Sequence, residues 1–338
     1  MFSVVFIVRD EEHTLPEAIT SLGDVPEIVV CDTGSSDRTV EVATSLGARV
    51  CLFAWSDDFS AARAFAQQHA AHEWIVRFDA DERLAVETGA AATWLRDAVR
   101  LGQDRGASMV CVRRYYAPGR EHWFPRCYRR SAWRWKYPVH ELLVSATGRR
   151  VPVVAAHGAT VRHVRQERPR NYRRILLAAL EPHPADPYLL FYMGEACWQE
   201  GDWAAAVGWL SRYIKSEGGY RWHRSEAFLL RGRAYMMLRE HELALEDFES
   251  ASVINGPRAE PMLAAAELCL SLGDPQCARV YAERGRRTEL PMEIQMFGEP
   301  DAPYVTDRRA YAQEPWLRIL ERCKESHPAK TGHSGKPG

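Results

Sequence analysis

The chain has 338 residues, of which 46% are hydrophobic and 26% charged, and its formal net charge is −1. This composition predicts a folded, soluble protein with room for two domains, and it argues against a general nucleic-acid or membrane-surface binder. The eight cysteines form no Cys-x-x-Cys pair, so we expect reduced, mostly buried thiols in a cytoplasmic protein. No signal-peptide pattern and no apolar run of about 18 residues is present, so no membrane span is expected.

The first half alternates apolar and amphipathic segments, which is typical of a parallel α/β sheet. In such sheets, ligands bind beyond the carboxyl ends of the strands. Strands are expected at 3–8, 27–31, 49–53 and 74–78, with helices at 14–22, 38–46 and 59–71. Further on, a helix is expected at 86–101, strands at 109–116 and 127–135, and antiparallel strand material at 151–164.

Two carboxylates follow the fourth predicted strand. Asp79 and Asp81 are separated by one residue, so an extended backbone points both side chains to the same side. Like charges this close are costly unless a cation lies between them, and hard oxygen ligands suit Mg²⁺ or Mn²⁺. The alternative is a solvated turn after a buried strand.

The second half contains an internal repeat. The interval from Gly194 to Ala206 equals that from Gly232 to Ala244, and Ala266 with Ala278 repeats it a third time. Small and aromatic residues at these offsets resemble tetratricopeptide repeats, helix-turn-helix units of about 34 residues that stack into a solenoid. We therefore expect an α/β domain at 1–168, a helical repeat domain at 169–325 and a disordered tail at 326–338.

Four motifs in the first half occur in a fixed order, and together they resemble family 2 glycosyltransferases. The resemblance is to the GT-A fold, and to the subgroup whose catalytic domain is followed by tetratricopeptide repeats. It implies a Rossmann-like nucleotide-sugar transferase, which needs a site for the donor and an open face for the acceptor. The motifs are Ile7-Val8-Arg9-Asp10-Glu11-Glu12, Ile28 to Thr39 with Asp32-Thr33-Gly34-Ser35 at its centre, Trp55 to Arg63, and Phe78-Asp79-Ala80-Asp81-Glu82.

The resemblance implies that the donor, with a UDP-sugar expected first, binds at the strand ends. Asp32 would bind the nucleoside and Glu11 would lie beside the ribose, although Asp32 also fits an Asx turn and Glu11 an exposed loop charge. A guanidinium at Arg63 would face the diphosphate, unless it pairs with Asp57 or Asp58. The full implied set for the nucleotide-sugar is Val8, Arg9, Glu11, Asp32, Arg63 and Asp79.

The resemblance also implies a metal site and a catalytic base. Asp81 would touch Mn²⁺ or Mg²⁺ directly, and Asp79 would reach the ion through water or touch the ribose. Members of this subgroup take a further ligand from a late histidine, for which His163 is the first candidate and His157 the second. In the Val139-His140-Glu141 pattern, Glu141 is the expected base of an inverting transfer, and His140 would orient it, bind the acceptor or be the base itself.

The acceptor is not indicated by the motifs. Repeat surfaces commonly bind peptides, so a protein, peptide or glycan is expected. A modified DNA base is a weaker alternative, suggested by the arginines and tryptophans between 113 and 136. The rival class is a non-catalytic repeat scaffold with a degenerate first domain. The sequence does not indicate the oligomeric state.

Overall fold

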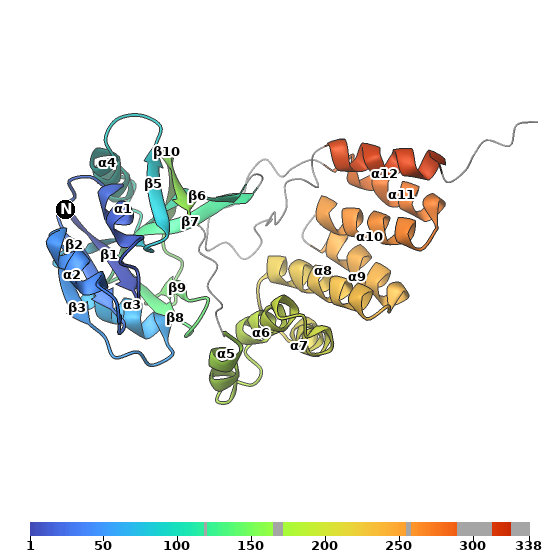
Figure 1. Ribbon diagram of the computed structural model, residues 1–338, viewed down its shortest axis with the longest axis horizontal. Helices are drawn as coiled ribbons and strands as arrows, with labels where there is room; N and C mark the ends of the chain where they lie inside the picture. Colours follow the sequence, from blue (N-terminus) through green and yellow to red (C-terminus); the bar gives the residue numbers. More distant parts are fainter. Residues whose placement is uncertain (118–119, 165–171, 255–257, 289–312, 326–338) are drawn as a thin grey trace, which may run out of the picture. The chain divides into compact units, whose positions relative to one another are not determined.

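The computed structural model describes residues 1–117, 120–164, 172–254, 258–288 and 313–325 (Figure 1). Within these residues the chain divides into two compact units, Met1–Tyr192 and residues 193–288 with 313–325. The division falls inside helix α6, Pro187–Gln199, so one helix begins in the first unit and ends in the second. The boundary expected at 168/169 and the expected tail at 326–338 lie outside the described residues.

The first unit is built on a mixed eight-stranded sheet with the order β3-β2-β1-β4-β7-β6-β10-β5. Strands β3, β2, β1 and β4 run parallel, as the alternation of strands and helices predicted. The β4–β7, β7–β6 and β10–β5 pairs are antiparallel, whereas β10 is parallel to β6; β8 and β9 form a separate hairpin. The strands are β1 (Phe2–Val8), β2 (Ile28–Asp32), β3 (Arg49–Leu52), β4 (Trp74–Phe78), β5 (Glu82–Val86), β6 (Met109–Ala117), β7 (Arg120–Arg129), β8 (Trp133–Lys136), β9 (Leu142–Ser145) and β10 (Val153–His163).

Strand β5 corrects one of the sequence predictions. The helix expected from residue 86 begins at Ala91 instead, because the preceding residues form an edge strand beside β10. Glu82 and Leu84 are buried while Arg83 lies between them on the less buried side, which is the period of two that a strand requires. The motif after β4 therefore forms a tight turn between two strands.

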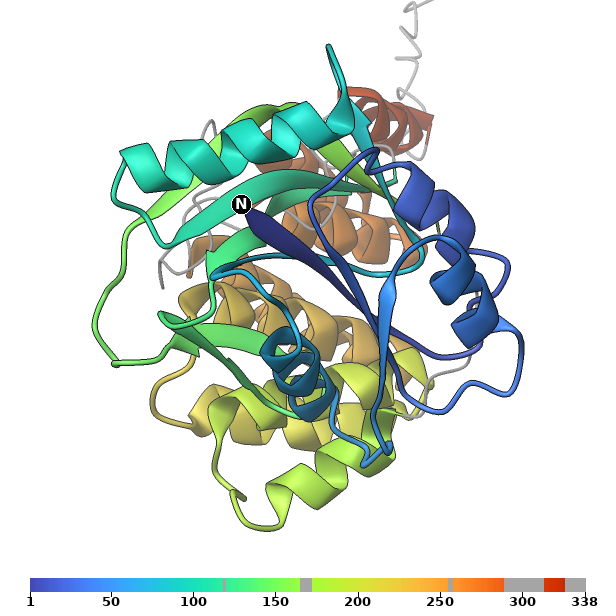
Figure 2. The same ribbon diagram turned by 90° about the vertical axis from the view of Figure 1, so that its left-hand side faces the viewer.

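Both faces of the sheet are covered. Alternate residues of β1 divide between two cores, with Phe6 on the side of α1 and α4 and Val5 on the side of α3 and the β8–β9 hairpin. Figure 2 shows α4 lying along the sheet. The helices of this unit are α1 (Leu15–Thr20), α2 (Thr39–Ser45), α3 (Phe59–Gln68), α4 (Ala91–Asp104) and α5 (Tyr172–Leu180), followed by the start of α6.

The second unit is helical, and each helix packs on its neighbour in sequence. A Cβ added at Gly194 would lie 2.6 Å from Leu210, and one at Gly232 would lie 2.7 Å from Phe248, so the two glycines allow the same close approach at the same offset. This equivalence agrees with the predicted repeat. The helices are α7 (Trp203–Lys215), α8 (Arg221–Met237), α9 (His241–Val253), α10 (Ala259–Ser271), α11 (Pro275–Gly285) and α12 (Gln313–Glu325).

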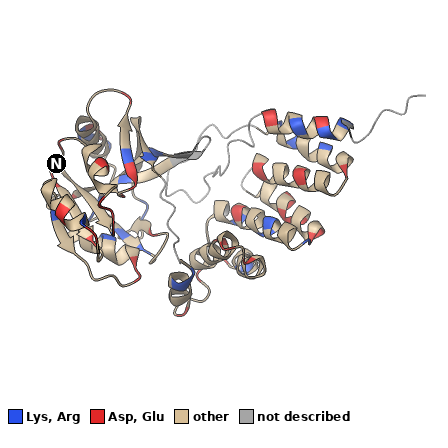
Figure 3. Cartoon of the chain, in the orientation of Figure 1, with Lys and Arg blue, Asp and Glu red and all other residues tan. Residues whose placement is uncertain are grey.

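Charges of both signs are intermixed on these helices (Figure 3). Some form ion pairs between helices, such as Arg231 with Asp247 at 2.7 Å and Arg284 with Glu249 at 2.8 Å. No helix within the described ranges is both long enough and apolar enough to cross a bilayer.

Candidate active site

Three neighbouring strands end at one edge of the sheet. In the register of the parallel strands, Val8 at the end of β1 lies beside Asp32 at the end of β2, and Phe6 lies beside Phe78 at the end of β4. The turns that follow β1, β2 and β4 therefore start close to one another. This topology brings the first, second and fourth sequence motifs together.

Asp32 organises the turn after β2. One of its carboxylate oxygens accepts hydrogen bonds from the backbone N–H groups of Gly34 and Ser35, both at 3.0 Å, and the other accepts one from the Ser35 hydroxyl. The side chain is thus the acceptor of an Asx turn, one of the two roles considered for it. Only 4% of the residue is exposed.

The turn after β1 is bonded to the turn after β2. Asp10 has a φ of +53° and accepts a hydrogen bond from the backbone N–H of Ser36 at 2.7 Å. The backbone N–H of Glu11 donates to the Thr39 hydroxyl at 2.7 Å, and the Glu11 carboxylate accepts from the Thr14 hydroxyl. These bonds hold both turns in one arrangement.

Val8 and Arg9 lie at the entrance to the same turn. The Val8 carbonyl accepts hydrogen bonds from the backbone N–H of Thr33 at 2.9 Å and from its hydroxyl at 3.0 Å. Arg9 is more exposed, and its Nε lies 4.0 Å from a carboxylate oxygen of Asp10. Of the two, only Arg9 presents a charged side chain toward solvent.

Asp79 is enclosed by arginines. Its two carboxylate oxygens lie 2.9 Å from Nη2 of Arg63 and 3.1 Å from Nη2 of Arg77. Burial disfavours the charged form of Asp79, but Arg63 and Arg77 outweigh this effect and hold its pKa well below its usual range. Asp79 is therefore ionised and held in an ion-pair network.

Arg63 joins Asp79 to the predicted base. Its Nε lies 2.5 Å from a carboxylate oxygen of Glu141, and only 7% of Arg63 is exposed. The partners considered for Arg63 are engaged elsewhere: Asp58 caps α3 through the backbone N–H of Ala61, and Asp57 pairs with Arg174 at 2.7 Å. Arg63 thus bridges the carboxylates of Asp79 and Glu141, which lie far apart in the sequence.

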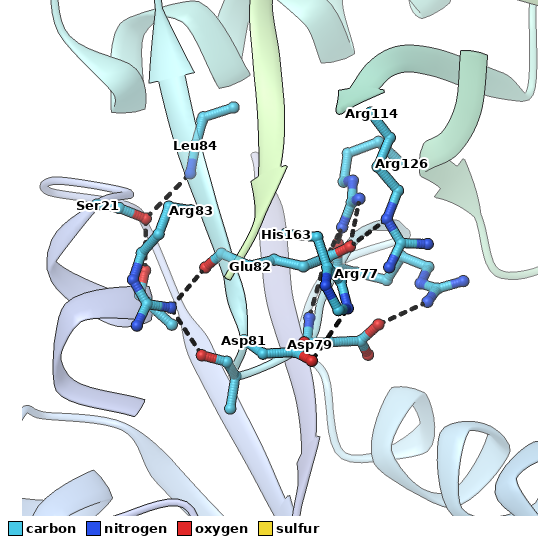
Figure 4. A network of polar contacts seen from close by, with 12 residues as sticks. Ser21, Arg77, Asp79, Asp81, Glu82, Arg83, Leu84, Arg114, Arg126 and His163 are labelled. Atoms are coloured by element: carbon cyan, nitrogen blue, oxygen red, sulfur yellow. Dashed lines mark hydrogen bonds and ion pairs between the residues drawn. The ribbon is translucent and has the colours of Figure 1, made fainter. Parts of the chain in front are cut away.

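Behind Asp79 lies a fully buried carboxylate, Glu82 (Figure 4). Arg126 donates to both of its oxygens, at 2.7 and 3.2 Å, and the Nε of Arg114 lies 2.9 Å from one of them. Glu82 also accepts a hydrogen bond from the backbone N–H of Asp79 at 3.0 Å. Burial opposes its ionisation, but the two arginines outweigh burial and lower the pKa of Glu82 to about 2.

The sequence analysis gave no role to Glu82 or Arg77, and it considered Arg114 and Arg126 only as part of the basic, aromatic segment between 113 and 136. A signal was present, because Arg77 stands inside the apolar run that forms β4, where a charge requires a partner. Arg77 pairs with nearby Asp79, whereas the arginines that pair with Glu82 come from β6 and β7, whose register the sequence alone does not provide. Sequence reasoning can therefore predict that a buried ion pair exists here without identifying its members.

Asp81 lies beside His163. The two side chains approach to 3.0 Å between the carboxylate Oδ2 and the imidazole Nε2, and the backbone N–H of Val164 donates to the Asp81 carbonyl at 2.7 Å. This contact arises because β10 runs antiparallel to β5 and ends with His163 opposite Glu82. Figure 4 shows His163 on the same side of the network as Asp79 and Asp81.

The competing histidine has different surroundings. The His157 ring packs edge-on against Trp123 at 4.9 Å between centroids, and its backbone carbonyl accepts a hydrogen bond from the Trp94 indole. The structure thus brings His163, and not His157, into contact with Asp81. No group of three or more His, Cys, Asp and Glu side chains within the described residues is arranged to hold a metal ion.

Glu141 ends the loop between β8 and β9. Burial raises the energy of its charged form, but Arg63 and Arg77 outweigh burial and lower its pKa. The neighbouring His140 has a φ of +51°, and its ring stacks on Tyr192 at 4.0 Å between centroids. The carboxylate is therefore held by arginine, while the imidazole is held by aromatic rings.

Comparison with known proteins agrees with the resemblance noted in the sequence. A TPR repeat-containing protein of Synechococcus elongatus is 35% identical over 231 residues, which cover 63% of this chain and 56% of that protein. An uncharacterized glycosyltransferase of Rickettsia typhi is 34% identical over 86 residues, which cover 25% of this chain and 29% of that protein. The chain thus spans little more than half of the first relative and less than a third of the second.

Among solved structures, a glucosyl-3-phosphoglycerate synthase from Mycobacterium tuberculosis, crystallised with Mn²⁺, UDP and glucosyl-3-phosphoglycerate, is 25% identical. The match covers 35% of this chain and 45% of that chain, with a TM-score of 0.28. Residues 3–164 match the sequence profile described as Glycosyl transferase family 2. The first half of this chain, residues 3–164, is therefore similar to glycosyl transferase family 2.

Proposed function

We propose that this protein transfers a sugar from a nucleoside-diphosphate donor to an acceptor hydroxyl, with inversion at the anomeric carbon and with a divalent cation. The observation that carries the proposal is the 3.0 Å approach of Asp81 and His163 at the edge where β1, β2 and β4 end. It brings together a carboxylate and an imidazole, two types of side chain that can bind a metal, beside the turns that hold the expected donor-binding residues. The match of residues 3–164 to the glycosyl transferase family 2 profile supports the reaction class.

Asp81 and His163 would hold Mn²⁺ or Mg²⁺. A carboxylate and an imidazole are both side chains that ligate divalent cations, and here they lie 3.0 Å apart. Such ions usually take their other ligands from water and from substrate phosphates, so two protein ligands suffice. When bound, the cation neutralises the charge that develops on the leaving nucleoside diphosphate.

The donor would lie along the turns that follow β1 and β2. We assign Asp32, Glu11, Val8 and Arg9 to the nucleoside and ribose, with UDP as the first nucleotide to test. The bonds between the two turns support this assignment, because they fix the backbone against which a nucleoside would pack. Arg63 and Asp79 would lie nearer to the phosphates and the sugar.

Glu141 is the proposed general base. Its lowered pKa keeps the carboxylate ionised at neutral pH, as a base requires. In the transfer, Glu141 would take the proton from the acceptor hydroxyl as the hydroxyl oxygen bonds to the anomeric carbon, and the bond to the diphosphate breaks. His140 is the less favoured base, because its ring is stacked on Tyr192.

The proposed acceptor is a protein, peptide or glycan. The repeated helix pairs of the second unit support this class, since arrays of this kind commonly bind peptides. A DNA base finds less support, because the charges on the second unit are of mixed sign.

Mass spectrometry can test the proposal directly. The full chain would be incubated with Mn²⁺ and a panel of UDP-, GDP- and dTDP-sugars, alone and with cell extract as the acceptor source. We expect release of one nucleoside diphosphate, and its loss in the Asp81→Asn variant. Absence of turnover together with absence of nucleotide binding by calorimetry would favour the non-catalytic scaffold.

A further inference from the structure

We infer that the first two turns of helix α6 belong to the catalytic machinery, with Tyr188 and Tyr192 as positioning residues for Glu141. This inference rests on the proposed function, because it gives α6 a role in presenting the proposed base. Both tyrosines belong to the first compact unit, although the helix continues into the second. Neither is part of any sequence motif that suggested the transferase.

The loop that carries Glu141 has a strained backbone. Tyr137 has a φ of +73° and His140 a φ of +51°, and neither is a glycine. Bulky residues rarely adopt this region, and they keep it only where their surroundings enforce it. A loop with two such residues just before the proposed base therefore depends on outside contacts for its shape.

Helix α6 supplies those contacts at both strained positions. The Tyr137 ring stacks on Tyr188 at 4.1 Å with an interplanar angle of 10°, and the His140 ring stacks on Tyr192 at 4.0 Å with an angle of 12°. The Tyr188 hydroxyl also donates to the His140 carbonyl at 2.6 Å. Because residues four apart share one face of a helix, both tyrosines meet the loop together.

A third group anchors the same region. Asp186 precedes the first residue of α6, and its carboxylate accepts a hydrogen bond from the backbone N–H of Tyr188 at 2.9 Å. The Tyr137 hydroxyl donates to the same carboxylate at 3.2 Å, and Lys136 approaches it to 3.9 Å. One carboxylate thus fixes both the start of α6 and the start of the strained loop.

On its other side, the loop is bonded to helix α3. The backbone N–H of Phe59 donates to the Pro138 carbonyl at 2.8 Å, and the Ser60 hydroxyl donates to the Tyr137 carbonyl. The same helix carries Arg63, which binds Glu141. The loop is therefore held between α3 and α6, and loss of the α6 contacts would let His140 and Glu141 relax away from Arg63.

Steady-state kinetics on full-length variants tests this inference. Tyr188→Leu removes both the stack and the hydrogen bond, whereas Tyr188→Phe keeps the stack. Tyr192→Leu removes its stack, whereas Tyr192→Phe keeps it. A matched control is Tyr235→Leu in α8, a partly buried tyrosine that contacts Arg231 and lies far from the loop in sequence.

We expect the two leucine variants to lower kcat roughly tenfold to a hundredfold, because small misplacements of a reacting group have effects of this size. Their affinity for the nucleoside diphosphate should stay within about twofold of wild type, since the contacts described above for Tyr188 and Tyr192 are with the loop at 137–140 and with Asp186 and not with the proposed donor residues. Tyr192→Phe should restore kcat, and Tyr188→Phe should be intermediate. The control should lower thermal stability without lowering kcat.

Three results would overturn the inference. An active wild type with unchanged kcat in both leucine variants would show that α6 has no role in presenting Glu141. A wild type without transfer from any donor would overturn the proposed function, and this inference with it. If a leucine variant does not fold, wild-type kcat in Tyr188→Phe combined with low kcat in Tyr192→Phe would also contradict the expected order.

Discussion

The two carboxylates that Arg63 joins are held in place by different means. Asp79 lies in a turn fixed by buried ion pairs, with Arg77 on one oxygen and Glu82 behind its backbone. Glu141 lies in a strained loop fixed by stacked rings and by hydrogen bonds to α3 and α6. The turn that holds Asp79 depends on charged side chains from neighbouring strands of one sheet. The loop that holds Glu141 depends on helix α6, which begins at Pro187, well after Glu141 in the sequence.

This difference predicts two kinds of failure. Removing one member of a buried ion pair leaves an unpaired charge and costs about 3–5 kcal/mol of folding stability. Losing an aromatic contact costs about 0.5–1.5 kcal/mol beyond the loss of buried area. Changes in the charged network should therefore appear first as instability, and changes at the rings first as slow catalysis.

The largest expected effect on activity comes from a change at Asp81, which lies in the turn after β4 and contacts His163. Asp81→Asn keeps the shape of Asp81 but should weaken the proposed binding of a cation beside His163. We expect donor turnover to fall about a thousandfold, since the charge on the leaving group loses its stabilisation. The unfolding temperature should be nearly unchanged, because Glu82 still holds the turn.

Turnover by Asp81→Asn can be measured against Mn²⁺ concentration. A decrease that is recovered at high Mn²⁺ would show weakened metal binding. Normal turnover at every concentration would show that Asp81 is not a ligand. His163→Ala should respond in the same direction, and His157→Ala should behave as wild type because its ring packs against Trp123.

The second largest effect is expected in the ring-held loop. Glu141→Gln removes the proposed base while keeping a side chain that can accept a hydrogen bond from Arg63. We expect transfer to fall about a hundredfold or more, which is typical for loss of general base catalysis. Nucleotide binding, measured by calorimetry, should remain. Unchanged transfer would move the role of base to His140 or elsewhere.

The two regions also differ in how far sequence predicts them. Asp32 and Asp79 were assigned to strand ends from the alternation of apolar strands and amphipathic helices, and the parallel register of β1, β2 and β4 confirms those places. Placing both residues at the same edge of the sheet required no long-range information. Adjacent parallel strands bring their carboxyl ends together wherever the connections have ordinary lengths.

The surroundings of Glu141 were not predictable in the same way. Tyr188 and Tyr192 fall inside the helical repeat domain that the sequence predicted at 169–325, and not in the predicted α/β domain that contains Glu141. Their stacking on Tyr137 and His140 depends on tertiary packing. A positive φ at a non-glycine residue likewise leaves no mark on the local sequence.

The third prediction concerns stability. Glu82→Gln keeps the shape of Glu82 but leaves Arg114 and Arg126 buried without their carboxylate. We expect a loss of about 3 kcal/mol, which corresponds to an unfolding temperature roughly 10 °C lower for a domain of this size. The matched control is Glu73→Gln, whose ion pair with Arg130 is about 40% exposed and should contribute less than about 1 kcal/mol.

Calorimetry on the two glutamine variants compares buried and exposed pairs directly. Equal shifts in unfolding temperature would mean that the network around Glu82 is no more important to the fold than a surface pair. A shift confined to Glu82→Gln would establish that the turn after β4 is held by charge.

The smallest expected effect is the pH dependence of that same contribution. The folded-state pKa of Glu82 is lowered to about 2 from an ordinary value of 4.5. Its stabilising effect is therefore fully present above pH 4.5 and is lost as the pH falls toward 2, because the unfolded chain binds the proton first. Between pH 4.5 and about pH 3 the loss of this stabilisation amounts to about 2 kcal/mol.

The difference in unfolding free energy between wild type and Glu82→Gln, measured with urea, should shrink over this range. Asp79, whose pKa is also lowered, should leave the variant with some acid sensitivity of its own. A difference that stays constant down to about pH 3 would contradict an ionised Glu82 in the folded state, and would require the arginines to be balanced by another group.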